Sequence, residues 1–281
     1  MIGRRGMIAG GAALAMLPRA ARALQPTPDF SWRHGTREQG CLMVGNASAG
    51  ATITLDGKPL HVSSDGWFGF GIAYDRKEPI DCLIELASGK KLREVVEPVV
   101  RQYDIQSITG LPEKYVEPPP EVAARMKREH ELIWTAREAD TDGIGFSEPL
   151  DWPFAGRLSG VFGSQRILNG KPMSAHLGVD IAAPEGTPIH APADGIVSIT
   201  DEFYLEGGFT LLDHGHGVST CCLHQSKRLV TAGQSVKRGE VIGHVGMTGR
   251  ATGPHTHWGL CWFQMKLDPS RATATPEPPK A

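Results

Sequence analysis

Histidine is concentrated in one part of this 281-residue chain, since eight of its eleven histidines lie between residues 176 and 257. Imidazole nitrogen and carboxylate oxygen are ligands that zinc favours, and a catalytic zinc site uses three protein ligands and leaves a fourth position to water. His176 and Asp180, in "SAHLGVDIAAP", are four residues apart. On an extended strand their side chains would lie ~13 Å apart, so they can share an ion only if the chain bends at Gly178.

Two histidine pairs with i, i+2 spacing are further candidates: His255 and His257 in "GPHTHWGL", and His214 and His216 in "DHGHG". On a strand, such residues point to the same face about 6.6 Å apart, so either pair could reach one small site. Glycine follows each histidine of the second pair, which favours a tight turn and a structural role. The spacing leaves open whether both His255 and His257 bind a metal, whether one does, or whether they are ordinary strand residues.

The other histidines have simpler interpretations. His190 and His244 each lie in an apolar strand pattern and are expected to be packed or surface residues. His224 ends the strand "STCCLH", where a buried, hydrogen-bonded strand histidine is the simplest interpretation. His130 lies among charged residues and is expected at the surface.

Two β-rich regions are predicted to position these residues. From residue 152 onward, glycine-punctuated segments predict the strands of an all-β domain; they are "GRLSGVFG", "DGIVSIT", "GGFTLLDHG", "GVSTCCLH", "GEVIGHVG" and "THWGLCWF". Upstream, residues 40–105 read as short strands, with hairpin turns at Asp56-Gly57 and Asp65-Gly66. We expect a small β-sandwich there that serves as a spacer or binding module.

A helix is predicted between the two β regions, in "EPPPEVAARMKREHELIWTAREAD". Proline is suited to the first turn of a helix, and Val122, Met126, Ile133 and Ala136 follow near helical spacing. The segment therefore predicts an amphipathic helix of about five turns.

The N-terminus has the pattern of an export signal. Residues 1–23 contain Arg4 and Arg5, an apolar run too short for a membrane span, and the sequence Ala21-Arg22-Ala23, which a signal peptidase would cut. The arginine pair fits a loose twin-arginine signal, with general secretion as the alternative. Cleavage would remove four of 29 basic residues and leave 31 acids, a net charge of −6 that argues against a nucleic-acid partner.

An oxidising compartment would allow disulfides among the five cysteines, Cys41, Cys82, Cys221, Cys222 and Cys261. Cys41 and Cys82 lie in the same β region and are the favoured pair, and one thiol must be left over. The last segment, "PSRATATPEPPKA", offers almost nothing to bury and is predicted to be a disordered tail.

In residues 152–268 the chain resembles the LytM or lysostaphin-type zinc metallopeptidases of the M23 family, which cut peptide cross-bridges in peptidoglycan. The resemblance is carried by "GSQRILNGKPMSAHLGVDIAAPEGTPIHAPADGIV", "LDHGHGVSTCCLH" and "VTAGQSVKRGEVIGHVGMTGRATGPHTHWGL". It implies a β-sheet fold of the duplicated hybrid motif type. It also implies Zn²⁺ bound by His176, Asp180 and His257, with His255 as general base and His224 orienting water or stabilising the oxyanion.

The chain departs from the family pattern at two places. The usual Tyr-x-His-Leu appears as Cys222-Leu223-His224-Gln225, and the usual His-Leu-His-Phe-Glu appears as "HTHWG". Neither change removes an implied ligand. If the strands of His224 and His257 are neighbours, Cys222 and Cys261 would lie on matching faces, and a bridge between them is conceivable.

The sequence thus predicts a mainly β chain divided into a signal peptide (1–23), an accessory β domain (24–112), a linker helix (113–141), a zinc peptidase domain (142–268) and a disordered tail (269–281). The expected function is that of an exported metalloendopeptidase acting on peptidoglycan stem peptides in the periplasm of a Gram-negative bacterium. No stable membrane anchor is expected after signal cleavage. The alternative is a non-catalytic activator of cell-wall amidases. A lipoyl-type carrier is disfavoured because "VGMTGRATG" has no lysine to display at a hairpin tip.

Overall fold

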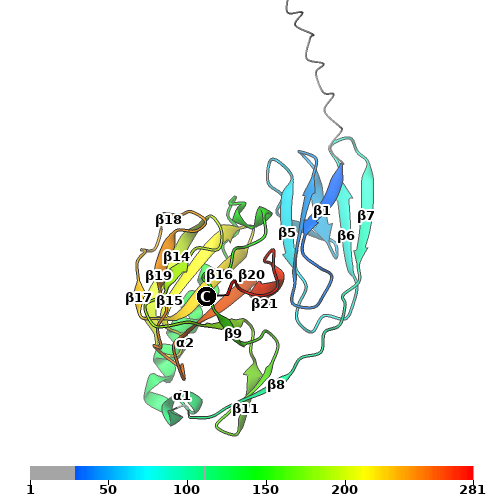
Figure 1. The fold of residues 1–281 in the computed structure, drawn as a ribbon. Helices are drawn as coiled ribbons and strands as arrows, with labels where there is room; N and C mark the ends of the chain where they lie inside the picture. Colours follow the sequence, from blue (N-terminus) through cyan, green and yellow to red (C-terminus); the bar gives the residue numbers. More distant parts are fainter. Residues whose placement is uncertain (1–28, 111, 281) are drawn as a thin grey trace, which may run out of the picture.

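A computed structural model describes residues 29–110 and 112–280, so the predicted signal peptide lies outside the described residues. The protein is mainly β, with two β regions that one long helix separates in the sequence, which confirms the predicted fold class (Figure 1). Within the described part of the chain, no helix combines the length and the apolar character needed to cross a bilayer.

The N-terminal region is a sandwich of two antiparallel sheets. One has the order β1-β2-β5, and the other β4-β3-β6-β7. Alternate residues of β6 are buried between the sheets, as expected for strands with one face on a core. The strands are β1 (Phe30–His34), β2 (Leu42–Ala47), β3 (Thr52–Leu55), β4 (Lys58–Leu60), β5 (Trp67–Gly71), β6 (Ile80–Glu85) and β7 (Lys91–Val96).

Of the two predicted Asp-Gly hairpins, one is confirmed. Asp56 and Gly57 have positive φ values of 48° and 76° and join β3 to β4, which pair directly. The turn at Asp65-Gly66 instead leads from β4 to β5, and these strands lie in different sheets. The hairpin prediction was wrong there. Asp-Gly indicates only that the chain reverses locally, whereas long-range packing determines which strands pair, and β4 and β5 pair in different sheets.

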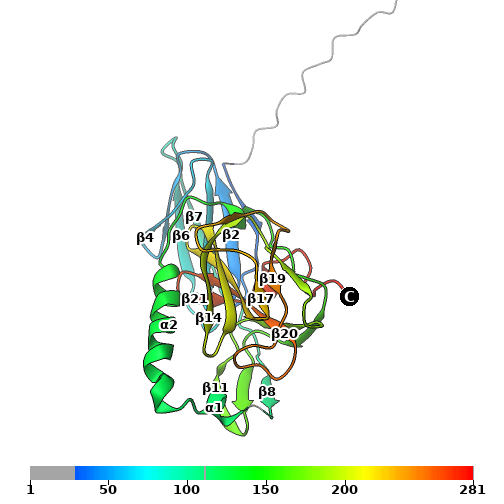
Figure 2. The ribbon, with the colours of Figure 1, turned by 90° about the vertical axis from the view of Figure 1, so that its left-hand side faces the viewer.

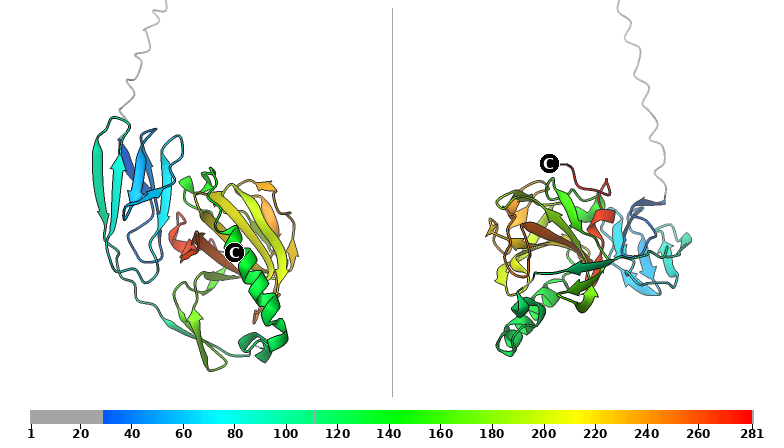
Figure 3. Two further views of the ribbon diagram at one scale, coloured as in Figure 1. Left: turned by 180° about the vertical axis from the view of Figure 1, so that it is seen from behind. Right: turned by 60° about the horizontal axis from the view of Figure 1, so that its bottom comes forward.

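The linker contains β8 (Ile105–Ile108), α1 (Glu113–Val116), η1 (Pro120–Val122) and α2 (Ala123–Ala136). The main helix has 14 residues, fewer than the predicted five turns, because Pro120 begins a 3-10 turn ahead of it. Ile133 of α2 packs against Phe203, Phe209 and Leu211. The helix therefore lies along one face of the large C-terminal sheet (Figures 2 and 3).

Residues 105–108 fall within the predicted accessory domain (24–112), but as β8 they pair in parallel with β10 (Gln165–Leu168) of the C-terminal region. The chain thus reaches the C-terminal region before the helix begins. The predicted domain boundary at residue 112 lies after this strand. Its pairing partner is 60 residues away, which local strand signals do not reveal.

The C-terminal region is built on a large sheet of order β18-β14-β15-β16-β20-β12-β9, with β21 paired to β20. A smaller sheet, β13-β19-β17, contributes Ile189 and Ile242 to the core beneath one face, where Trp258 is fully buried. The six predicted strand segments all contain observed strands. Their bounds are β9 (Arg157–Gly160), β10 (Gln165–Leu168), β11 (Lys171–Ala175), β12 (Val179–Ala182), β13 (Pro188–His190), β14 (Gly195–Phe203), β15 (Gly207–Gly215), β16 (Val218–Gln225), β17 (Lys227–Arg228), β18 (Ser235–Val236), β19 (Val241–His244), β20 (His255–Trp262) and β21 (Met265–Leu267).

The two β regions share one core. Leu42 and Val44 of β2 belong to the same buried cluster as Phe146, which lies in η2 (Gly145–Ser147), and Trp258. The His34 ring lies 3.0 Å from the Phe146 carbonyl oxygen through Nε2. The accessory region is therefore packed against the end of β20 remote from His255.

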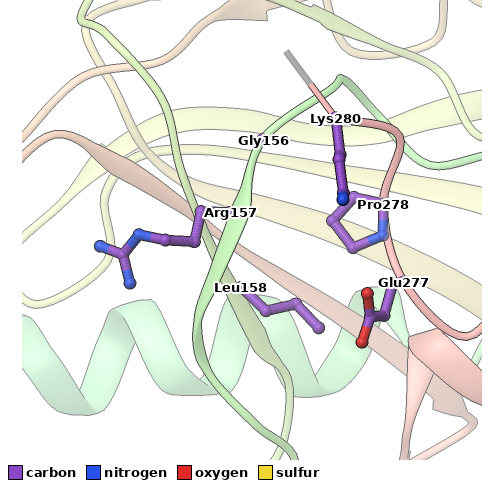
Figure 4. Close-up of a pocket in the computed structure, with 6 residues that line it drawn as sticks. All are labelled: Gly156, Arg157, Leu158, Glu277, Pro278 and Lys280. Carbon is purple, nitrogen blue, oxygen red and sulfur yellow. The ribbon is translucent and has the colours of Figure 1, made fainter.

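The C-terminal segment differs from the predicted disordered tail. Pro269–Arg271 form the 3-10 helix η3, and Trp152 Nε1 donates to the Thr275 carbonyl oxygen at 3.0 Å. Farther along, the Gly156 amide donates to the Pro279 carbonyl oxygen at 3.0 Å. Figure 4 shows Glu277, Pro278 and Lys280 beside the segment 156–158, with a pocket between them. The prediction was wrong because hydrogen bonds to backbone carbonyls hold this segment in place, even though it has few apolar residues to bury.

The five cysteines are all buried and free, so the favoured Cys41–Cys82 bridge is absent. Cys82 lies on β6, whereas Cys41 precedes β2 in the opposite sheet. The Cys222–Cys261 bridge is also excluded. Cys222 lies opposite Trp258, which is three residues from Cys261, so the two thiols point to opposite faces of the sheet. The parity argument from His224 failed because this residue has a positive φ of 65°, which breaks the strand alternation.

Candidate metal centre

Strand register brings a histidine and an aspartate together on one face of the large sheet. Strands β12 and β20 are antiparallel, and Asp180 lies directly opposite His257. His176 follows β11, and the chain bends at Gly178 before β12 begins. This is the bend that the spacing of His176 and Asp180 required, and it returns the two side chains to one point.

Three donor atoms form a small triangle at this point. His176 Nε2 lies 2.8 Å from His257 Nδ1, His257 Nδ1 lies 3.0 Å from Asp180 Oδ1, and His176 Nε2 lies 3.1 Å from the same oxygen. Tetrahedral zinc with bonds of about 2.0–2.1 Å needs ligand atoms about 3.3 Å apart. Two imidazoles and one carboxylate at these separations fit zinc in both donor type and spacing.

Neighbouring groups orient the three side chains. The His176 ring donates from Nδ1 to the Val161 carbonyl oxygen at 3.1 Å, which leaves the Nε2 lone pair free for a metal. Arg166 of β10 donates to Asp180 Oδ2, so the other oxygen of the carboxylate faces the histidines. Outer partners of this kind fix ligand orientation in metal sites.

Two glycines leave room for the ligands. A Cβ at Gly160 would lie 2.5 Å from Asp180 Oδ2, and a Cβ at Gly178 would lie 2.4 Å from His257 Nε2. Contacts this short do not occur, so any larger residue would displace a ligand. The glycine at 178 therefore provides space as well as the bend.

The charges of the triangle suit a cation. Burial alone would raise the pKa of Asp180, but hydrogen bonds with His176 and His257 outweigh it and hold this pKa well below the usual value. Burial lowers the pKa of His257 to about 4, despite its hydrogen bond with Asp180. Near neutral pH the site offers an ionised carboxylate and a neutral His257 imidazole, the protonation states that metal ligation requires.

His224 and His255 lie beside the triangle with their rings 4.8 Å apart. Each ring donates from Nδ1 to a carbonyl oxygen at 2.8 Å, His224 to Thr248 and His255 to Gly253. Burial and the neighbouring His255 lower the pKa of His224 to about 3. Because Nδ1 carries the hydrogen, the Nε2 atom of neutral His224 is an acceptor of protons or hydrogen bonds.

All five predicted site residues are thus neighbours. A cavity of about 50 Å³ is lined by Asp180, His224 and His255, together with Arg166 and Arg250. His176 and His257 complete the triangle at Asp180. The arrangement can hold a cation next to two imidazoles whose Nε2 atoms can accept hydrogen bonds.

The other histidines do not join the site. His214 is buried between the Asp194 carbonyl oxygen and Thr220 Oγ1, at 2.8 and 2.7 Å. His216 lies in the β15–β16 turn with a φ of 50°. The prediction of a structural pair at a tight turn is therefore confirmed. Within the described residues, His176, Asp180 and His257 form the one group with metal-binding geometry.

Arg166 was not predicted as a functional residue, although it contacts Asp180. A local signal exists in Asn169-Gly170, where both residues have positive φ and form the turn between β10 and β11. Asn-Gly is a strong hairpin signal, and a hairpin there returns β11 beside Arg166. The contact itself depends on the bend at Gly178, which local signals do not fix.

Comparison with known proteins agrees with this geometry. The model of peptidase family M23 matches residues 174–269. The chain is 42% identical over 105 residues to the peptidoglycan DD-endopeptidase ShyA of Vibrio cholerae, and 37% identical over 140 residues to the DD-carboxypeptidase/endopeptidase Mpg of Neisseria meningitidis. These matches cover 37% and 47% of this chain, but 24% and 30% of the relatives. The chain therefore spans less than a third of these two relatives.

A solved structure is similar over nearly the whole chain. A peptidase M23 from Pseudomonas aeruginosa is 31% identical, with a TM-score of 0.64 over 84% of this chain and 94% of that one. The likeness therefore includes the accessory region as well as the sheet that carries the triangle. On the family match and this likeness over 84% of the chain, the chain belongs to peptidase family M23.

Proposed function

We propose that this peptidase is an exported zinc metalloendopeptidase that hydrolyses peptide cross-links of bacterial peptidoglycan. The observation that carries the proposal is the triangle of His176 Nε2, Asp180 Oδ1 and His257 Nδ1, with two acceptor imidazoles beside it. The similarity to ShyA, a peptidoglycan DD-endopeptidase, and to Mpg, a DD-carboxypeptidase/endopeptidase, supports peptidoglycan as the substrate. The signal-like sequence of residues 1–23 supports export to the periplasm, where this substrate is found.

In the proposed mechanism, zinc held by the three ligands would polarise the scissile carbonyl and lower the pKa of water from 15.7 toward ~7. His255 acts as the general base. Its Nδ1 hydrogen is committed to the Gly253 carbonyl oxygen, so Nε2 takes a proton from the attacking water and returns it to the leaving amine. Asp180 lies 4.0 Å from this Nε2 and stabilises the imidazolium that forms.

His224 orients the water in this proposal. Its Nδ1 hydrogen is donated to the Thr248 carbonyl oxygen and its pKa is lowered to about 3 by burial, so the ring is neutral and Nε2 has no hydrogen. A nitrogen in this state accepts a hydrogen bond and cannot donate one to an oxyanion. Of the two roles that the resemblance implies for His224, the tautomer supports orientation of water.

The test is digestion of purified sacculi, with products identified by mass spectrometry and metal content measured on the same sample. We expect peptide cross-links to be cut, the activity to disappear with a chelator, and about one zinc ion per chain. Full cleavage by a metal-free protein would overturn the zinc assignment. A protein that cuts nothing but increases amidase cleavage in the same sacculi would favour the alternative of a non-catalytic activator.

A further inference from the structure

A second pocket lies next to the metal centre on the same face of the large sheet. It has a volume of about 140 Å³ and is lined by Trp134 and Arg137 from the end of the helical segment, Cys221 from β16, His257 from β20, and Lys266 from β21. His257 borders this pocket and also belongs to the triangle. A molecule in the pocket would therefore be separated from the metal centre only by the His257 imidazole ring.

Arg137 is a buried cation without an anionic partner. Its side chain is 7% exposed, and Nη2 reaches only Cys221 Sγ, at 3.9 Å. Nε has no hydrogen-bond partner, and among the described residues Glu206 acts on the guanidinium only at longer range, without an ion pair. A buried guanidinium normally requires a paired anion, because desolvation of an uncompensated charge is costly. The chain therefore leaves an anion-binding group unsatisfied in this pocket.

A second donor points toward the same space. With zinc on Nδ1 of His257, Nε2 would carry the hydrogen of the neutral ring. A Cβ at Gly259 would lie 2.8 Å from Cys221 Sγ and 3.9 Å from His257 Nε2, which places this nitrogen on the side of β20 that faces Cys221. Metal-binding histidines usually donate their other ring hydrogen to a carboxylate, a carbonyl or water. No such bond from Nε2 is formed within the described part of the chain.

The charge of the pocket favours an anion. Arg137 and Lys266 are cationic and Glu206 is the one acidic residue of the lining, so the cationic groups outnumber the acidic one. The exposed indole of Trp134 stands at the rim and can cover an aliphatic stem. A carboxylate on a short side chain matches this volume, this charge and the planar donor fork of arginine.

We propose that this pocket is a subsite for an ionised carboxylate of the substrate, on the side of the scissile bond that extends toward α2. The inference rests on the proposed peptidase function and adds a substrate requirement to it. Arg137 donates to the carboxylate from its guanidinium, and in the zinc-loaded chain His257 Nε2–H would be a second donor. A peptide held in this way would be aligned across the metal centre.

The test compares a cross-linked stem-peptide dimer with analogues in which each carboxylate is amidated in turn. Binding to the metal-free full chain is measured by calorimetry, so no cleavage interferes. Amidation of one particular carboxylate is expected to weaken binding roughly tenfold or more, as loss of a charge-assisted hydrogen bond would, while the other amidations have little effect. Equal binding of all analogues by the unmodified protein would overturn the proposal without the use of any variant.

Two variants identify the residue responsible. Arg137→Gln should lose the discrimination between acid and amide, and Arg137→Lys should recover part of it, because lysine keeps the charge but not the planar fork. Arg128→Gln changes an exposed arginine of the same helix and should behave as the unmodified protein. Retained discrimination in a folded Arg137→Gln variant would refute the assignment. If that variant does not fold, Lys266→Gln is expected to reduce the discrimination more weakly, and unchanged discrimination would again refute it.

Cleavage with zinc then separates this proposal from the proposed function. A zinc-loaded chain that binds the dimers through Arg137 but cuts none of them would overturn the peptidase function and leave the subsite. A chain that cuts acid and amide dimers with the same KM and kcat would retain the function and overturn the subsite.

Discussion

At the scale of single residues, His255 and His257 share a strand face but differ in their contacts. His257 Nδ1 is within 3.0 Å of both other ligand atoms, whereas His255 donates to Gly253 and keeps Nε2 free. We expect His255→Ala to retain zinc while cleavage falls about 10²–10⁴-fold, the usual contribution of a general base. His257→Ala should lose both. Zinc per chain by plasma mass spectrometry, beside peptide cleavage, checks this, and equal zinc loss in the two variants would show that the roles are wrongly assigned.

Gly178 allows a sharper test of ligand space. A Cβ there would lie 2.4 Å from His257 Nε2, so Gly178→Ala must push this ring away from Asp180. We expect zinc affinity to fall by tenfold or more, as measured by competition with a chromophoric chelator. Gly253→Ala is the matched control, because a Cβ at 253 meets nothing within 4 Å. Similar zinc affinity in both alanine variants would contradict a steric role for Gly178.

The five residues that the sequence proposed for the centre lie together in the structure, although their roles stay predictions. Strand periodicity placed His255 and His257 on one face, and turn glycines explained His214 and His216, yet only the family resemblance distinguished ligand from base. Arg166 and Arg137 were missed because each reaches its partner through a long-range contact. The residue spacing near Arg137 does not indicate that its guanidinium contacts Cys221, which is 84 residues away in the sequence.

At the scale of elements, the β15–β16 turn carries a pH-sensitive contact with the accessory region. His216 stacks on His61 of the sandwich with ring centroids 3.8 Å apart, and His61 pairs with Asp140 and Asp142. Burial, and then His61, lowers the pKa of His216 from 6.5 to about 4. Between these pH values the unfolded chain binds the proton more readily, so the stability contributed by neutral His216 is lost as pH falls from 6.5 to 4.

We therefore expect His216→Asn to flatten the fall of Tm between pH 6.5 and 4. Asparagine tolerates the positive φ of 50° at this position and does not titrate. The difference in Tm between the variant and the unmodified protein at pH 8 reports the packing that is lost. The further change in this difference at lower pH reports the effect of protonating His216. Parallel Tm curves for the two proteins would refute the assignment.

Elements were predicted well where the signal is local. Glycine-bounded apolar runs located the strands of the large sheet, and Asp56-Gly57 located a hairpin. The failures have one cause, which is pairing between distant segments. The β8–β10 pair, the strand change after Asp65-Gly66 and the anchored segment after Asp268 all depend on partners far along the chain.

At the scale of the molecule, the shared core predicts that the two β regions unfold together. Leu42 is 1% exposed and packs in the cluster that also holds Phe146 and Trp258. Leu42→Ala should cost about 2–5 kcal/mol, and calorimetry should show one transition that moves as a whole. Val100→Ala, at a side chain 60% exposed, is the control and should change little. Two separate transitions would contradict a common core.

The parallel pairing of β8 with β10 has a mechanical consequence. The linker leaves the accessory region and adds β8 as a third, parallel strand beside β10 of the β10–β11 hairpin (Figure 1). Arg166 of β10 contacts Asp180. A pull on the N-terminal half would load these parallel hydrogen bonds in shear before it reached the helix. Tension on the N-terminal half would meet the shared core first. Once that core had opened, the force would act on β8 and, through β10, on the arginine that contacts Asp180.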